Sequence, residues 1–175
     1  ENPTPKRLHV RRLEDGKWTE LAKDLPATRP QADAYSYAVT VHRGEPVLAV
    51  CDGTDGGHAS LLVYAWKDGQ WTRLGEPLNV LGPEGGALKP AIVSDGKALH
   101  VAWPEFLPSR PPLLFVKTWD GAKWTLTGGP LNEWPGRGSA HTPTMAILDS
   151  RPVVAWTEYD PNSERLRQVF VRASK

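Results

Sequence analysis

The chain has 175 residues and a mass of 19.3 kDa, with 21 Lys and Arg against 20 Asp and Glu, and a formal net charge of +1. This balance gives nucleic acid no basic surface to bind, and no apolar run approaches the ~20 residues of a membrane-spanning helix. The eight Trp, one Cys and one Met exclude a disulfide-stapled miniprotein and a coiled coil, and they favour a rigid, Trp-packed fold.

The first five residues, Glu1–Pro5, are polar and contain two Pro, which is not the pattern of a signal peptide. They suit either a linker or a mature end left after removal of a leader, and the sequence does not separate the two. The first β-type run begins at Leu8.

An internal repeat of 53 residues organises the rest of the chain. Seven of the eight Trp fall into three series with this spacing: Trp18, Trp71 and Trp124; Trp66 and Trp119; Trp103 and Trp156. The repeats cover residues 8–60, 61–113 and 114–166, and residues 167–175 begin a fourth. A strict period of this length indicates one supersecondary unit used several times.

Each repeat predicts four short strands. In the second repeat these are, in chain order, residues 61–66, 70–74, 89–94 and 99–103. The pairs Asp68-Gly69 and Asp95-Gly96 each separate two β-rich runs, and Asp-Gly is a preferred sequence for a two-residue hairpin turn. No segment keeps a 3.6-residue period, so we expect almost no helix.

A four-stranded antiparallel unit of ~50 residues whose strands are apolar on both faces is typical of a β-propeller blade. We therefore expect an all-β fold of propeller-type blades in a single domain over residues 1–175. Large, flat Trp side chains suit the wedge between neighbouring blades. A β-sandwich is the rival interpretation, but it gives no reason for a strict period.

Three blades are too few for a ring, because propellers have ~4 to 8. The chain opens with the two outer strands of a blade, residues 8–13 and 17–21, and it ends with the start of a fourth unit. Because these ends are complementary, we expect a two-fold dimer that closes a six-bladed ring, with each C-terminal sheet completed by the N-terminal strand of the other copy. The alternative is that these residues belong to a longer propeller.

The repeat also resembles that of a known group of proteins. The string W-x-D-G-x-W-T-x-L-G-x-P-L-N at Trp66–Asn79, followed by V-A-W-P-E at Val101–Glu105, is similar to a repeat of bacterial secreted β-propellers labelled sialidase-like or lectin-like. Trp119–Asn132 and Val154–Glu158 match it again, whereas the first repeat departs from it. The resemblance implies a propeller and an extracellular or cell-surface location. The S-x-D-x-G-x-x-W box and the arginine cluster of sialidases are not found.

Acidic residues recur at the end of the fourth strand, as Asp52, Glu105 and Glu158. They could form a cation site or accept hydrogen bonds from sugar hydroxyls, although hydrogen bonds to a neighbouring blade are the interpretation that we favour. Trp103 and Trp156 lie two residues before two of these acids, on the same strand face. A Trp beside a carboxylate can bind a pyranose ring, but packing between blades is again favoured.

Trp134 is the one Trp outside the repeat, in a Gly-rich loop that also holds Arg137. A non-repeated indole in such a loop is the best single candidate for ligand binding. The candidate ligand-binding residues are therefore Trp134, Arg137, Trp103, Glu105, Trp156 and Glu158.

The remaining reactive residue types give no motif. Cys51 lies in an apolar run and is expected to be a small buried hydrophobe. His141 could face a central channel, but a solvated loop histidine is favoured. The five His show no zinc spacing, and G-x-S-x-G, H-E-x-x-H, P-loop and C-x-x-C motifs are absent. We therefore expect no catalytic residue, no metal and no cofactor.

These observations predict a non-catalytic module, and so no enzyme, that binds a carbohydrate or another surface ligand. The alternative is an architectural or protein-interaction propeller without a small ligand. A weaker alternative is a fragment of a sialidase-like glycosidase. The expected partners are a second copy of the chain and a glycan or another protein, with no nucleic acid and no membrane span.

Overall fold

The computed structural model describes residues 8–21, 25, 33–53, 58–82, 84–163 and 167–173, apart from the side chains of residues 33–35. Within these ranges every regular element is a β-strand. No described helix is long and apolar enough to cross a membrane.

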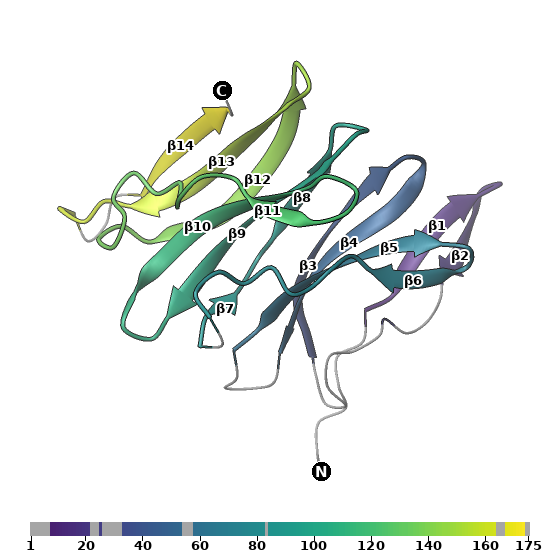
Figure 1. The fold of residues 1–175 in the computed structure, drawn as a ribbon, viewed down its shortest axis with the longest axis horizontal. Helices are drawn as coiled ribbons and strands as arrows, with labels where there is room; N and C mark the ends of the chain where they lie inside the picture. The colour runs from purple at the N-terminus through teal and green to yellow at the C-terminus, as the bar shows by residue number, and fades with distance from the viewer. Residues whose placement is uncertain are drawn as a thin grey trace, which may run out of the picture.

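The strands form a hairpin and three antiparallel sheets that follow one another along the chain (Figure 1). The N-terminal hairpin consists of β1 (Val10–Glu14) and β2 (Lys17–Leu21). The first sheet consists, in spatial order, of β3 (Asp33–His42), β4 (Glu45–Gly53), β5 (Ser60–Lys67) and β6 (Gln70–Arg73). The second consists of β7 (Gly86–Ala87), β8 (Ala91–Ser94), β9 (Leu99–Leu107), β10 (Arg110–Trp119) and β11 (Trp124–Leu126). The third consists of β12 (Ala140–Leu148), β13 (Arg151–Tyr159) and β14 (Arg167–Ala173).

The 53-residue repeat is visible in this arrangement, and it confirms the expected all-β architecture. Strands β4, β9 and β13 are the same element of successive repeats, as are β5, β10 and β14. Strands β3, β8 and β12 are the first strands of their sheets and pack against one another, so they define the inner side of the array. The third sheet has three strands, and no closed ring is formed by the described residues.

The two Asp-Gly pairs of the second repeat, Asp68-Gly69 and Asp95-Gly96, form different types of turn. Asp68 and Gly69 have φ of 50° and 81°, as a type I′ hairpin turn requires. The turn at Asp95-Gly96 is instead closed by the side chain of Asp95, which accepts hydrogen bonds from the backbone N–H groups of Lys97 (2.7 Å) and Ala98 (2.6 Å). This second turn is therefore an Asx-type turn.

The third strand of each repeat, which is the first strand of each sheet, is irregular where sequence predicts a regular one. The register shifts between Ala34 and Ser36 in β3, and between His141 and Thr144 in β12. In the second sheet the predicted strand 89–94 is reduced to β8, and Lys89 adopts a φ of 45°. Ser36, Lys89 and Thr142 occupy equivalent positions, so the irregularity itself belongs to the repeat.

Apolar side chains fill the spaces between successive sheets. The first and second sheets enclose a cluster that includes Leu61, Val101 and Trp103, and the second and third enclose one that includes Leu114 and Trp156. A further cluster lies between the N-terminal hairpin and the first sheet. Of the seven Trp of the repeat, six thus pack between sheets as expected, and the seventh, Trp18 on the hairpin, is 67% exposed.

Cys51 is a free, fully buried thiol within the first of these clusters. Burial raises its pKa to about 12, with a hydrogen bond from Ser36 opposing the shift. The thiol is therefore protonated at neutral pH and poorly nucleophilic. The expectation of a small buried hydrophobe is confirmed.

Candidate functional site

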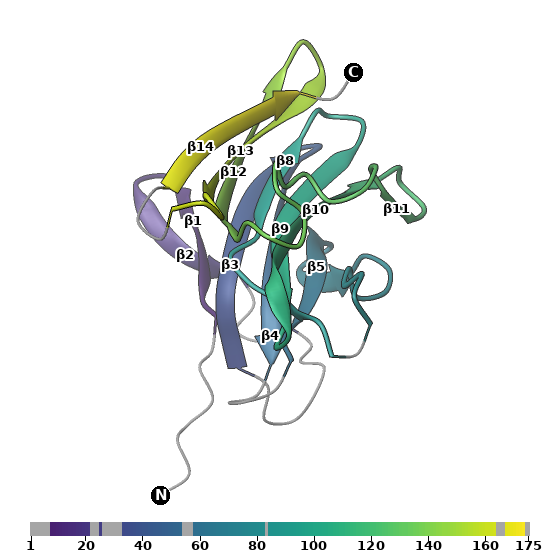
Figure 2. The same cartoon turned by 90° about the vertical axis from the view of Figure 1, so that its left-hand side faces the viewer.

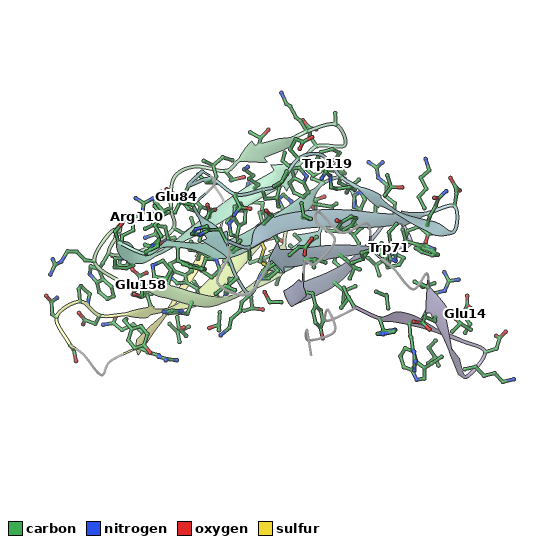
Figure 3. The ribbon with its side chains drawn as sticks, turned by 90° about the horizontal axis from the view of Figure 1, so that it is seen from below. Glu14, Trp71, Glu84, Arg110, Trp119 and Glu158 are labelled. Atoms are coloured by element: carbon green, nitrogen blue, oxygen red, sulfur yellow. The ribbon has the colours of Figure 1, made fainter. Side chains whose placement is uncertain are left out.

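The connections at one end of the array hold the candidate residues. This end, the lower end in Figure 1, carries the loops before β8 and β12 and the turn between β9 and β10, and β13 ends and β14 begins there; we call it the loop end. Figure 3 views the molecule from this end and labels Glu84, Arg110 and Glu158 there. The opposite end carries the tight turns β3–β4, β8–β9 and β12–β13.

Glu158 lies at the loop end of β13 and is completely buried. Its carboxylate accepts hydrogen bonds from the backbone N–H groups of Glu133 (2.9 Å) and Trp134 (3.0 Å) and from Nε1 of Trp156 (3.0 Å). Three donors of this kind compensate for the desolvation of a buried carboxylate. Glu158 thereby fixes the loop before β12 onto the third sheet.

Glu105 makes the same contacts one repeat earlier. It accepts hydrogen bonds from the N–H groups of Val80 (2.9 Å) and Leu81 (2.7 Å) and from Nε1 of Trp103 (3.0 Å). A Cβ atom on Gly85 would collide with the carboxylate, which explains why this position is Gly.

An Asn completes each arrangement. Asn132 accepts a hydrogen bond from the N–H of Leu114 (2.8 Å) and donates to the carbonyl oxygens of Pro112 (3.1 Å) and Gly138 (3.2 Å). Asn79 does the same in the second repeat, toward Leu61, Ala59 and Gly85. We call each set of Asn, Gly, Trp and Glu a loop clamp: Asn79, Gly85, Trp103 and Glu105, and Asn132, Gly138, Trp156 and Glu158.

The loop clamps account for four of the six residues that sequence selected for ligand binding. Trp103, Glu105, Trp156 and Glu158 are buried, and their polar side-chain atoms are hydrogen-bonded within the fold. These contacts give each of the four a structural role that recurs with the repeat. Ligand binding by any of them stays a prediction. The Asn and Gly members were missed, although both also recur at 53 residues.

The other two candidates lie together at the loop end. Trp134 is half-buried and meets the ring of Phe170 edge-on at 5.5 Å, while its carbonyl oxygen accepts hydrogen bonds from the N–H groups of Arg137 (3.0 Å) and Gly138 (2.8 Å). Arg137 is exposed, and Nη2 donates to Oδ1 of Asn162 (3.3 Å). Trp134 is thus held by the clamp of Glu158 and by β14, with part of its surface open to solvent.

A cationic group, His141 and Arg167 around the ring of Tyr159, lies where β12, β13 and β14 reach the loop end. The ring of His141 is perpendicular to that of Tyr159 at 5.5 Å, and the guanidinium of Arg167 lies over the Tyr159 ring at 4.5 Å and contacts its hydroxyl. Burial lowers the pKa of His141, and the charges of Arg167 and Lys89 lower it further. Sequence reasoning missed Tyr159 and Arg167, because nothing in the sequence shows that the ends of β13 and β14 bring them together.

Apart from the buried Asp52, three described acids at the loop end lie outside the clamps. Glu133 forms an ion pair with Arg172 (2.8 Å). Asp160 accepts hydrogen bonds from the N–H of Asn162 (2.8 Å) and from the amide of Gln168 (3.3 Å). Glu84 is exposed. Among the residues that the structure describes, no group of three or more His, Cys, Asp or Glu could hold a metal ion.

No protein-family model matches the chain, and no curated protein sequence matches it either. Among solved structures it is similar to the GH93 α-L-arabinofuranosidase of Fusarium graminearum in complex with arabinobiose, with a TM-score of 0.73 and 15% identity over 99% of this chain and 56% of that one. It is also similar to an endo-arabinase from Bacteroides thetaiotaomicron, with a TM-score of 0.53 and 14% identity over 90% of this chain and 61% of that one. A fucose lectin from Kordia zhangzhouensis has a TM-score of 0.51 and 11% identity over 79% of this chain and 93% of its own.

These similarities show a fold of the β-propeller type, and at such identities they show the fold alone. The chain spans little more than half the length of the arabinofuranosidase. The general kind of protein that the sequence resembled is therefore supported, whereas the particular repeat strings are not tested.

The expectation of a non-catalytic module, and of no enzyme, is corrected by the same structures. Most of them are glycoside hydrolases, although one is a lectin. The physical reason for the error is twofold. The repeated Trp and acidic residues that suggested sugar binding are packed inside the fold, and a catalytic site assembled from single loop residues leaves no motif in the sequence.

Replacing a clamp carboxylate tests its structural role. Glu105→Gln and Glu158→Gln each keep the shape but turn one acceptor into a donor that faces backbone N–H groups, so we expect a loss of about 1–3 kcal/mol in the free energy of unfolding. Urea denaturation followed by Trp fluorescence measures this loss. The exposed control Glu84→Gln should change it by less than about 0.5 kcal/mol. Clamp variants as stable as that control would contradict the assignment.

The electrostatics of the cationic group predict the titration of His141. Its pKa should lie below the ordinary 6.5, and Arg167→Gln should raise it, because removal of a positive charge favours the protonated ring. Two-dimensional NMR of the imidazole resonances against pH measures both values. Arg137→Gln, on the same end but not among the charges that act on His141, should leave the pKa unchanged. A pKa of 6.5 or above in the unmodified protein would be incompatible with this environment.

Proposed function

We propose that this chain forms part of a β-propeller glycoside hydrolase that cleaves α-L-arabinofuranosyl linkages at its loop end. The observation that carries the proposal is the TM-score of 0.73 over 99% of the chain to an arabinofuranosidase in complex with arabinobiose. The similarity to an endo-arabinase supports the same class of substrate.

Glycoside hydrolysis requires two carboxyl groups, about 5 to 10 Å apart, one of which donates a proton to the leaving oxygen. Glu105 and Glu158 do not suit this role, because their oxygens are buried and engaged by N–H donors. We assign it to the accessible acids of the loop end, Glu84 and Asp160. Glu84 and Arg137 occupy equivalent positions of successive repeats, which places a negative and a positive group on neighbouring loops.

The non-repeated residues of the third sheet supply binding groups in this proposal. The open part of the Trp134 indole provides a flat apolar surface for a sugar ring. His141, Arg167 and Arg137 provide hydrogen-bond donors for its hydroxyls. In this proposal the propeller is a closed ring of six blades. It acts outside the cell, in line with the similarity of Trp66–Asn79 to the repeats of secreted propellers.

Hydrolysis of linear arabinan and of 4-nitrophenyl α-L-arabinofuranoside tests the activity directly. We expect the purified protein to release arabinose or arabino-oligosaccharides, and Glu84→Gln and Asp160→Asn each to lower kcat by about 100-fold or more. Glu76→Gln, an exposed acid that pairs with Arg73, serves as the control and should retain full activity. Absence of hydrolysis by the unmodified protein, or full activity of both acid variants, would refute the proposal.

Binding at Trp134 is tested separately from catalysis. Trp134→Ala should weaken the affinity for arabino-oligosaccharides about 2- to 10-fold, because it removes a stacking surface worth about 0.5–1.5 kcal/mol. Titration calorimetry with an inactive acid variant measures the affinity. Leu126→Ala removes an exposed apolar side chain from β11 of the second sheet and should leave it unchanged. Equal affinities of the two variants would exclude Trp134 from the site.

A further inference from the structure

The outer face of the third sheet is apolar and uncovered. On β14, Val169 is 70% exposed and Val171 is 64% exposed. Figure 2 looks along the array from this side, and no described element lies in front of β14. The other edge of β14 is free among the described strands, because β14 pairs with β13 and with no further described strand.

The same positions are buried in the other two repeats. Val171 corresponds to Val116 and Val63, after allowance for a loop that is two residues longer before β14. Val116 and Val63 are 4% and 1% exposed, because the next sheet of the chain packs on them. Val169 likewise corresponds to Leu114 and Leu61, which are not exposed at all. The open face is thus one half of an interface that the chain builds twice internally.

The other half of that interface is open at the N-terminal side of the array. Tyr37, Val39 and Val41 on β3 are 60–61% exposed, whereas Ile92, which corresponds to Val39 one repeat later, is buried. The N-terminal hairpin covers only the outer part of the first sheet, through Leu21 and its neighbours.

Strands β1 and β14 compete for one place in the repeat. Leu8 and Val10 correspond to Val169 and Val171, since both pairs lie in the strand that begins a 53-residue repeat and that forms the third strand of a sheet. Leu8 and Val10 pack against the apolar cluster on the first sheet. The side chains of Val169 and Val171 carry the same apolar chemistry but have no partner surface among the described residues of their own chain.

We propose that a second copy of this chain covers the open face by strand exchange. The third sheet of one copy packs on the first sheet of its partner, Val169 and Val171 take the place of Leu8 and Val10 there, and the free edge of β14 pairs with the partner's β2. The exchange is reciprocal, so the contact closes by two-fold symmetry and leaves no open face. Each third sheet then gains its fourth strand, and the two copies together form six sheets.

The exchange places the loop-end groups at a junction between copies. Tyr159 and Arg167 are paired residues of β13 and β14, and they lie on the same face as Val169 and Val171, at its loop end. A second copy seated on that face therefore lies beside the cationic group. This inference deepens the closed ring of the proposed function, and its test needs no glycan, so either proposal can fail without the other.

Light scattering coupled to size-exclusion chromatography tests the exchange over a range of protein concentrations. We expect a mass of twice 19.3 kDa for the unmodified chain. Val171→Asp should give the single-chain mass, with a dimer Kd raised by about 100-fold or more, because it places a charge in the buried contact. Its side chain is exposed in the isolated chain, so folding should be unaffected.

Two further variants separate exchange from simple stacking. In the exchanged dimer Val10 is displaced from the first sheet, so Val10→Asp should remain dimeric. In a stacked dimer the N-terminal hairpin keeps its place in the contact, so Val10→Asp should give the single-chain mass. Leu126→Asp, an exposed apolar position on β11 outside the contact, should also remain dimeric. A single-chain mass at every concentration, a larger oligomer, a dimeric Val171→Asp or a monomeric Val10→Asp would each overturn the proposal.

Discussion

The loop clamp is the interaction on which the arrangement of the loop end depends. A carboxylate such as Glu158, buried without a cation, is tolerable only if N–H donors surround it, and the loop before β12 supplies them through Glu133 and Trp134. In return, the carboxylate fixes the path of that loop and excludes any side chain at Gly138. The position of Trp134, and the shape of any site beside it, follows from a structural hydrogen-bond network.

The clamp also explains why the repeat was a poor guide to chemistry. A residue that recurs in every blade is one that the blade itself requires, as Trp103 and Glu105 show. Residues that break the repeat are not explained by the needs of the blade in this way. Trp134 replaces Leu81, Arg137 replaces Glu84 and His141 replaces Leu88 at corresponding positions, and all three lie toward the loop end of the third sheet.

Local patterns predicted the strands and the Asp68-Gly69 turn, because both depend on neighbouring residues. The register shifts in β3 and β12, the clamps and the cationic group could not be predicted, because each depends on contacts between residues that are distant in the chain, such as Asn79 with Leu61 and Glu158 with Trp134. Of the candidate site, sequence identified Trp134 and Arg137 by their departure from the repeat but missed Tyr159 and Arg167. The prediction of a non-catalytic module rested on the absence of sequence motifs, and groups that come together from separate loops leave no such motif.

The first repeat departs from the other two in a way that the exchanged ring accounts for. Val50 and Asp52 stand where Trp103 and Glu105 form a clamp, and Val50 packs against Leu21 of the N-terminal hairpin. The two junctions between the described sheets each run through a loop that a clamp fixes to the sheet that follows it. In the proposed exchange, the sheet that packs on the first sheet comes from the other copy, and the smaller side chain at position 50 leaves room for it.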